Sequence, residues 1–298
     1  MRKKLALKQV GTISMAVIET KNLTYTYPGR TEPSIKDVSI KIEKGEFTLI
    51  TGPSGCGKTT LCRCFNGLIP HFYQGELKGE ITAAGLKVVE HQISELARHV
   101  GLVFQNPENQ LFALSVEKDV AFGLENLGVP REKMRKRVEW ALKLTGIDDL
   151  RERAPHELSG GQQQRVAIAS VLAMQPKVMV LDEPTSFLDP LGAKKIFEVI
   201  YELNRKLGVT IALVEHRLDL TARYADHIIV MDNGKVVLDG EPRETLSSEE
   251  ARLIGVGIPK ATRLYQILQK DGRIRLGNTI PLCSDEMASM LREALKSQ

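Results

Sequence analysis

The sequence has few cysteines, no long apolar run and little net charge, and each shortage excludes a class of protein. Four cysteines among 298 residues are too few for a disulfide-rich secreted scaffold, and they fit a reducing cytosol. The longest uncharged apolar stretch, Val166–Met174, is about half as long as a bilayer-spanning helix. Lysine and arginine number 41 against 37 acidic residues, and the resulting net charge of +4 is too small to indicate a nucleic-acid partner. We therefore expect neither an integral membrane protein nor a nucleic-acid-binding one.

What is present is the composition of an ordinary globular protein, 26% charged and 42% hydrophobic. The length allows one large domain, or two modest ones, to bury a core without disulfides. The amino terminus, Met1–Lys4 followed by three apolar residues, imitates a signal peptide, but Lys8 ends the apolar run and no small-residue cleavage site follows. We expect residues 1–14 to form a disordered leader. Met15 is an alternative start, because the alternating pattern begins at Val17.

Short runs of apolar, β-branched residues alternate with longer helical patterns, which is typical of an α/β protein. The alternation of Val38, Ile40 and Ile42 with polar residues predicts one strand with a single buried face. Continuous runs predict further strands, the last two joined by a hairpin: Phe47–Thr51, Val178–Leu181, Ile211–Val214, Ile228–Met231 and Val236–Leu238. We expect a parallel sheet with helices on both faces.

Two segments differ from this pattern. Arg131–Leu144 has apolar residues at helical spacing, and residues 117–164 show no strong strand signal, so we expect a helical insertion. Beyond Gly240 the sequence predicts a small appended domain of helical segments: Glu244–Leu253, Ala261–Gln269 and Ser284–Leu295.

A glycine-rich segment directly after the predicted strand Phe47–Thr51 fits the phosphate-loop pattern. The glycines let backbone N–H groups wrap the phosphates, and the following helix directs its positive end at them. Lys58 would reach the β- and γ-phosphates, Thr59 would bind Mg²⁺, and Thr60 would touch the α-phosphate. A mere tight turn is the alternative, but the strand before and the helix after argue against it. The candidate ATP-binding residues here are Gly52, Pro53, Ser54, Gly55, Cys56, Gly57, Lys58, Thr59 and Thr60.

An acidic pair ends the predicted buried strand Val178–Leu181. Asp182 can hold Mg²⁺ directly or through water, and Glu183 can polarise the attacking water. On its own such a pair is usually a solvated turn. Together with a phosphate loop, it predicts an NTPase.

A second candidate phosphate cradle precedes another predicted helix, in the residues Ser159, Gly160, Gly161 and Gln162. A single nucleotide site does not need a second cradle. Two cradles and one set of hydrolytic residues are explained by a head-to-tail dimer. Each ATP would then lie between Lys58 of one subunit and Ser159 of the other.

With these motifs in this order, residues 17–240 strongly resemble the ATP-binding-cassette (ABC) ATPases. The resemblance implies that Tyr27 stacks on adenine and that Gln105 senses Mg²⁺ and the γ-phosphate. It also implies that Asp189 communicates across the dimer and that His216 contacts the γ-phosphate. Phe187 departs from the smaller residue that is commoner at its position.

The fold implied is an α/β P-loop NTPase (RecA-like) core with an N-terminal antiparallel β subdomain, an inserted α-helical subdomain and a small C-terminal helical extension. The cassette is expected at residues 15–245, with its helical subdomain at about 106–165, and the extension at 246–298. The resemblance further implies that two ATPs close the dimer and that hydrolysis lets it open.

Two kinds of ABC protein fit, a transporter's motor subunit and a soluble ATPase of translation or DNA repair. A single cassette without a long coiled-coil insertion or a strong basic patch favours transport. Within transporters, Phe104–Phe112, Val116–Gly123 and Glu215–Asp219 resemble the energy-coupling-factor (ECF) type, which imports vitamins or transition-metal ions.

That type implies a second ATPase subunit, in a homodimer or heterodimer, and two membrane partners. These are an integral coupling subunit and a separate substrate-binding subunit, so the chain would lie at the cytoplasmic face of the cell membrane. Apolar residues after Gln105 would receive the coupling subunit, although they also fit a plain helical core: Leu111, Phe112, Val116, Val120 and Phe122.

Overall fold

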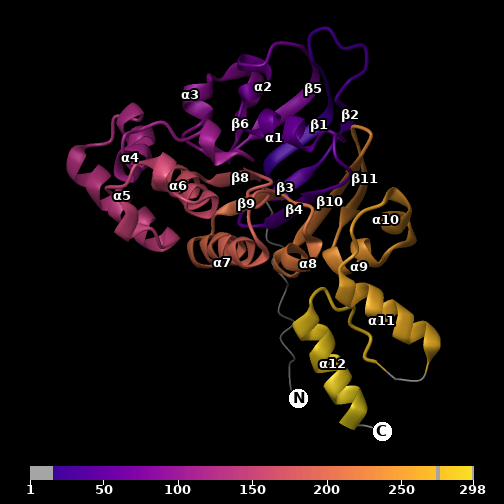
Figure 1. Ribbon diagram of the computed structural model, residues 1–298. Coiled ribbons are helices and arrows are strands. Elements are labelled where there is room, and N and C mark those ends of the chain that lie inside the picture. Colours follow the sequence, from indigo (N-terminus) through magenta and orange to yellow (C-terminus); the bar gives the residue numbers. More distant parts are fainter. Residues whose placement is uncertain (1–15, 273–275, 297–298) are drawn as a thin grey trace, which may run out of the picture.

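The computed structural model describes residues 16–272 and 276–296, so the predicted leader 1–14 lies outside the described residues. Two β-sheets, an inserted group of helices and a carboxy-terminal group of helices make up the molecule (Figure 1). The first sheet is antiparallel, with β1 paired to β2, β3 and β5. Its strands are β1 (Ala16–Thr26), β2 (Ile35–Val38), β3 (Lys41–Glu43), β5 (Glu76–Ala83) and β6 (Leu86–Lys87).

The segment predicted as one strand through Val38, Ile40 and Ile42 is divided between β2 and β3. All three side chains are buried on one face, as predicted, but the strand is interrupted. The cause is Thr20 on β1. Its hydroxyl donates to the carbonyl of Val38 at 2.9 Å and accepts from the N–H of Ile40 at 3.1 Å. The Thr20 side chain thus makes two of the bonds between the strands at this point, while its backbone N–H still donates to the carbonyl of Ile40 at 3.0 Å.

The second sheet has the order β11-β10-β4-β9-β8-β7, and all its neighbours are parallel except the β10–β11 hairpin. The predicted parallel sheet is therefore confirmed, with β7 as an additional strand that the sequence did not reveal. Its strands are β4 (Phe47–Thr51), β7 (Val100–Val103), β8 (Val178–Asp182), β9 (Thr210–Val214), β10 (His227–Asp232) and β11 (Lys235–Gly240).

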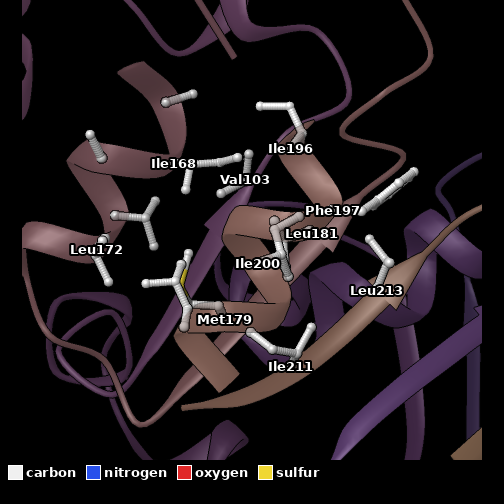
Figure 2. Close-up of a cluster of buried hydrophobic side chains, with 14 of the residues drawn as sticks. Val103, Ile168, Leu172, Met179, Leu181, Ile196, Phe197, Ile200, Ile211 and Leu213 are labelled. Carbon is white, nitrogen blue, oxygen red and sulfur yellow. The ribbon is translucent and has the colours of Figure 1, made fainter. Parts of the chain in front are cut away.

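Alternate residues of these strands enter two different cores, because successive side chains of a strand point to opposite faces. On one face, Met179 and Leu213 meet side chains of α6 (Gly160–Ala173) and α7 (Pro190–Leu207), as Figure 2 shows. On the other face, Val180 and Val214 join a core with the antiparallel sheet and α1 (Lys58–Phe65). The parallel sheet is thus fixed rigidly between two apolar layers.

The inserted segment is entirely helical or irregular, in agreement with the predicted helical subdomain. Helices α4 and α5 pack on α6 and form a lobe at one side of the parallel sheet (Figure 1). The elements of residues 104–177 are η2 (Pro107–Asn109), α4 (Val116–Asn126), α5 (Arg131–Thr145), η3 (Asp148–Leu150), η4 (Pro155–Glu157) and α6. Short helices elsewhere are α2 (Leu68–His71), η1 (Val88–Glu90), α3 (Ile93–Leu96), α8 (Leu218–Thr221) and η5 (Ala222–Tyr224).

The carboxy-terminal helices differ from the prediction in one respect, since the single helix predicted at Glu244–Leu253 is two. Ser248 has extended backbone angles and caps the second of them, accepting from the N–H of Ala251 at 3.1 Å. The last helix is held to the preceding part by Arg243, which donates to both carboxylate oxygens of Glu286 at 2.8 and 2.9 Å. The helices are α9 (Pro242–Ser247), α10 (Glu249–Ile254), α11 (Lys260–Asp271) and α12 (Ser284–Lys296).

Throughout residues 16–272 and 276–296, no helix combines the length and the apolar character needed to cross a membrane.

Candidate active site

The candidate site is built at the carboxyl edge of the parallel sheet. Strands β4, β9, β8 and β7 are neighbours and run in the same direction, so the residues that follow them meet at one edge. The phosphate loop follows β4, Gln105 follows β7, Glu183 follows β8, and His216 follows β9. Segments far apart in the sequence thus converge at one place.

The phosphate loop wraps around the side chain that begins α1. The ammonium group of Lys58 donates to the carbonyl oxygens of Gly52 and Pro53 at 3.0 and 2.9 Å, and the residue is 5% exposed. Gly57 is the N-cap of α1 at φ 108°, and no side chain caps this helix. A Cβ at Gly57 would lie 2.5 Å from the carbonyl oxygen of Ser34, so only glycine fits. The first N–H groups of α1 therefore face the loop without a side-chain acceptor.

A hollow of about 350 Å³ opens in front of this loop. It brings together most of the predicted phosphate-binding and hydrolytic residues. It also includes Ser34, which the sequence analysis did not select. The lining residues are Ser34, Ser54, Gly55, Gly57, Lys58, Thr59, Thr60, Gln105 and Glu183.

The predicted metal residues Thr59 and Asp182 lie in contact, and their chemistry fits a hard cation. Thr59 lies beside the Asp182 carboxylate and lowers its pKa, against the larger effect of burial. Asp182 is 5% exposed, burial raises its pKa, and its Oδ1 has no partner in the described part of the chain. An oxygen that is buried and unpaired is costly unless a cation compensates it. The amide nitrogen of Gln105 donates to Glu183 and Ser186, which leaves the amide oxygen to bind the cation.

Glu183 is the centre of a hydrogen-bonded cluster. Its Oε1 lies 2.9 Å from Nε2 of His216, and its Oε2 accepts from Nε2 of Gln105 at 2.9 Å and from Oγ of Ser186 at 3.1 Å. The hydrogen bond with His216 is the main cause that holds the pKa of Glu183 below its usual range. The carboxylate therefore stays ionised, as a proton acceptor must.

The backbone of Glu183 is held in a left-handed conformation, at φ 47°, and its N–H donates to the carbonyl of Val214 at 3.0 Å. Such a conformation costs free energy in a residue other than glycine, and it persists only where the surroundings enforce it. The bond to the end of β9 provides that enforcement, and it holds Glu183 beside the His216 segment.

Tyr27 lines a second hollow of about 530 Å³, which adjoins the first through Ser34 and Gly55. Its hydroxyl lies 3.3 Å from Oγ1 of Thr60 and accepts from Arg63 at 3.0 Å. Its ring packs edge-to-face on Tyr25 with centroids 4.8 Å apart. The ring is thus fixed at the wall of a space next to the phosphate loop, where a nucleotide base would lie.

The remaining predicted residues are not brought to this hollow within one chain. Ser159 caps α6, and its backbone N–H donates to Oε1 of Gln162 at 2.9 Å. Gly160 and Phe187 line another hollow of about 250 Å³, which adjoins the one at Lys58 through Gln105. Asp189 caps α7 through the N–H of Gly192 at 2.8 Å, and it is exposed. Several predicted residues beside the hollow do not line it either: Gly52, Pro53, Cys56, Tyr27, Asp182 and His216. The others that do not line it are Ser159, Gly160, Gly161, Gln162 and Asp189.

Comparison with known proteins decides the family, because the family model described as "ABC transporter" matches residues 35–186. The chain belongs to the ABC transporter family. It is 43% identical to the energy-coupling factor transporter ATP-binding protein EcfA of Methanocaldococcus jannaschii, in an alignment that covers 94% of this chain and 99% of that protein. The predicted ABC ATPase is confirmed, and the relative supports the ECF type.

Solved structures support the same assignment. CbiO1 of Clostridium perfringens, described as part of the ABC transporter complex cbiONQ, aligns with a TM-score of 0.72 and 38% identity over 85% of this chain and 99% of that one. A dimeric ATP-binding cassette in a post-hydrolysis state, bound to ADP and Pi, aligns with a TM-score of 0.66 and 31% identity over 76% and 99%. The chain is an ATP-binding ABC ATPase with the predicted P-loop fold.

Proposed function

We propose that this ABC ATPase is the motor subunit of an ECF-type importer that takes up a small micronutrient, a vitamin or a transition-metal ion. The observation that carries the catalytic part is the cluster of Glu183, His216 and Gln105 at the hollow of the phosphate loop. The similarity to EcfA and to CbiO1 supports the transport part.

The residues of one chain divide the chemistry of hydrolysis among them. Lys58 and the open N-terminus of α1 hold the phosphates, and Tyr27 takes the base. Thr59, Asp182 and the amide oxygen of Gln105 would hold Mg²⁺, which would neutralise part of the phosphate charge. Glu183 accepts the proton of the water that attacks the γ-phosphorus, and His216 keeps that carboxylate aligned.

The second half of each site comes from another ATPase subunit, identical or not. The N-terminus of α6, with Ser159, Gly160, Gly161 and Gln162, reaches the γ-phosphate of the partner's ATP, and Asp189 lies at the same interface. Unlike His216 and Tyr27, which hydrogen-bond to residues lining the hollow at Lys58, these five residues form no hydrogen bond to that lining within the described chain, which supports this arrangement. ATP then favours the closed dimer because its γ-phosphate touches both subunits, and hydrolysis removes that advantage.

Glu183→Gln tests the catalytic proposal. We expect hydrolysis to fall by roughly 10²–10⁴-fold, because the amide cannot accept a proton, while ATP binding persists. Size-exclusion chromatography with ATP should show an accumulated dimer. Glu132→Gln, which changes an exposed glutamate of α5, serves as the control and should hydrolyse ATP normally. Near-normal turnover in Glu183→Gln would remove Glu183 as the base.

A membrane subunit is proposed to dock on the lobe formed by α4–α6. The residues predicted for docking divide there, since Val116 and Val120 are fully buried whereas Phe112 and Phe122 are 65% and 43% exposed. The two exposed rings contact each other edge-to-face at 4.6 Å. An apolar pair exposed on a surface lobe fits a protein partner. It supports attachment to an integral coupling subunit at the cytoplasmic face of the membrane, with a separate substrate-binding subunit.

Phe112→Asp tests this docking. We expect roughly 10-fold less co-purification of an integral membrane subunit from the native membrane, since a charge would be buried at the contact. Val237→Asp is the matched control, because Val237 is 41% exposed on β11, away from the lobe (Figure 1). Equal recovery with Phe112→Asp would exclude this surface. If the wild-type chain recovers no membrane subunit, a soluble ABC ATPase becomes the better reading.

A further inference from the structure

A buried carboxylate lies beneath the catalytic cluster. Glu215 follows β9 directly and is only 3% exposed. Its backbone N–H donates to the carbonyl of Ile50 at 3.2 Å, which continues the pairing of β9 with β4. Within the described residues, no lysine, arginine or histidine forms an ion pair with it. A carboxylate in such a place requires other donors.

Three hydrogen bonds supply them, from two separate segments. The hydroxyl of Thr185 donates to Oε2 at 2.6 Å. The backbone N–H groups of His216 and Arg217 donate to Oε1 at 2.8 and 3.0 Å. Thr185 itself is fully buried, so this bond has no competition from water. One carboxylate therefore ties the segment after β8 to the segment after β9.

These two segments carry the groups that must meet for hydrolysis. Thr185 stands two residues after Glu183, and His216 stands directly after Glu215. The side chains of Glu183 and His216 also join these two segments, in a contact of 2.9 Å between Oε1 and Nε2. Arg217 adds a further bond, from Nη2 to the carbonyl of Leu188 at 2.9 Å, next to Asp189.

We propose that Glu215 is a positioning residue for ATP hydrolysis, which holds the His216 loop against the Thr185 segment so that His216 stays aligned with Glu183. This inference rests on the roles proposed for Glu183 and His216. Glu215 does not touch the nucleotide hollow. Its effect is therefore exerted entirely through the other two residues.

Thr185→Val is the cleanest test, because it keeps the side-chain shape and removes only the hydroxyl. We expect kcat of the full chain to fall roughly 10-fold or more, as misalignment of a catalytic group does, with KM for ATP within about 3-fold of wild type. Thr185→Ser restores the hydroxyl and should restore kcat. Glu215→Ala should lose at least as much as Thr185→Val. Glu215→Gln, whose oxygen still accepts the two N–H groups, should lose less.

A double-mutant cycle separates positioning from a purely structural role. Once His216→Ala has removed the aligned side chain, adding Thr185→Val should change kcat by less than about 3-fold. Thermal unfolding of each variant is measured alongside, and Thr185→Val should lower the midpoint, because it leaves a buried carboxylate with one donor fewer. All kcat values are therefore measured well below the lowest midpoint, so that unfolding does not account for the loss. Wild-type kcat in Thr185→Val, or losses that multiply in the cycle, would overturn the proposal. Glu183→Gln is measured in the same series to tell two failures apart. If it is inactive, either of these results rejects only the positioning role of Glu215. If it is active, the proposed role of Glu183 as the base is rejected as well.

Discussion

The polar groups at the two edges of the parallel sheet differ in the hydrogen-bond partners that they have. At the amino edge, the charged groups bond to one another, although Oδ1 of Asn204 is buried without a hydrogen-bond partner among the described residues. Asp226 accepts from the N–H of Phe47 at 3.0 Å and from Arg205 at 2.6 Å. The side chain of Asn204 donates to the carbonyl of Gly45 at 2.8 Å. This edge joins the strands to the helix and turn that precede them.

At the carboxyl edge, important groups have no partner of their own. Oδ1 of Asp182 is buried and unpaired within the described residues, and α1 begins without a side-chain cap. Since the polar groups of a folded interior are normally satisfied, these open groups indicate where a ligand completes the structure. The contrast predicts that substitutions at the carboxyl edge affect function more than stability, and that substitutions at the amino edge do the reverse.

The largest effect is expected from Lys58→Ala, at the carboxyl edge. Each charge-assisted hydrogen bond to phosphate is worth about 1.5–3 kcal/mol, so losing two of them should weaken ATP binding roughly 100- to 10,000-fold. Titration with a fluorescent ATP analogue measures this. The unfolding midpoint should change little, because Lys58 bonds only within its own loop, to two carbonyls and to the Cys56 sulfur. Lys44→Ala, at an exposed turn, is the control. Tight ATP binding by Lys58→Ala would contradict the assignment of the loop.

Ser159→Asp tests a second helix N-terminus. Unlike the N-terminus of α1, which has no side-chain cap, that of α6 is capped by Ser159, whose side chain is paired within its own chain. Aspartate is as good an N-cap as serine, so α6 should remain intact. Its negative charge would repel the partner's γ-phosphate. We expect ATP hydrolysis to fall about 100-fold, the usual cost of losing one transition-state donor, while ATP binding to the single chain is unchanged. Ser248→Asp, the matched change at the N-cap of α10, should hydrolyse ATP normally.

Mixing the two carboxyl-edge variants tests the arrangement in trans. A mixed dimer of Lys58→Ala and Ser159→Asp contains one site with an intact Lys58 and an intact Ser159. Activity should therefore rise above that of either variant alone. If the wild-type chain hydrolyses ATP as a homodimer, absence of any recovery would contradict the placement of Ser159 in the partner's site.

Much of the fold and site could be predicted, because local sequence patterns carry it. The buried strands β4, β8, β9 and β10 are continuous apolar runs, and a polar motif follows three of them directly. β7 was missed because it is only four residues long and contains Gly101, a poor strand former. That glycine is required by packing, since a Cβ there would lie 2.2 Å from a side-chain atom of Val171.

The missed site residues act through contacts between segments that no local pattern reveals. Thr185 and Glu215 are 30 positions apart, and Ser186 gains its role only because Glu183 turns back toward it. A signal for Glu215 was present, namely an acidic residue directly after a fully apolar strand. Only the strand order shows that this carboxylate lies against Thr185 rather than in solvent.

The smallest effect is expected from His227→Gln, at the amino edge. His227 begins β10 and lies between Glu46, at 3.2 Å, and Asp239, with which its Nε2 is in close contact. Hydrogen bonds with Asp239 and then Glu46 raise the pKa of His227 from 6.5 to about 9. Because the folded-state pKa is raised, the stabilisation is fully present below pH 6.5 and disappears as the pH rises through about 9.

His227→Gln should therefore lower the thermal unfolding midpoint by about 2–4 °C at pH 6, a shift that corresponds to roughly 1 kcal/mol in a chain of this size. At pH 10, where the imidazole is neutral in both folded and unfolded chains, the difference should approach zero. ATP binding at pH 7 should stay normal, since His227 is at the opposite edge from the phosphate loop. His156→Gln, which changes an exposed histidine, should leave the midpoint unchanged at both pH values. An equal loss at pH 6 and pH 10 would mean that His227 stabilises this edge by packing and not by its charge.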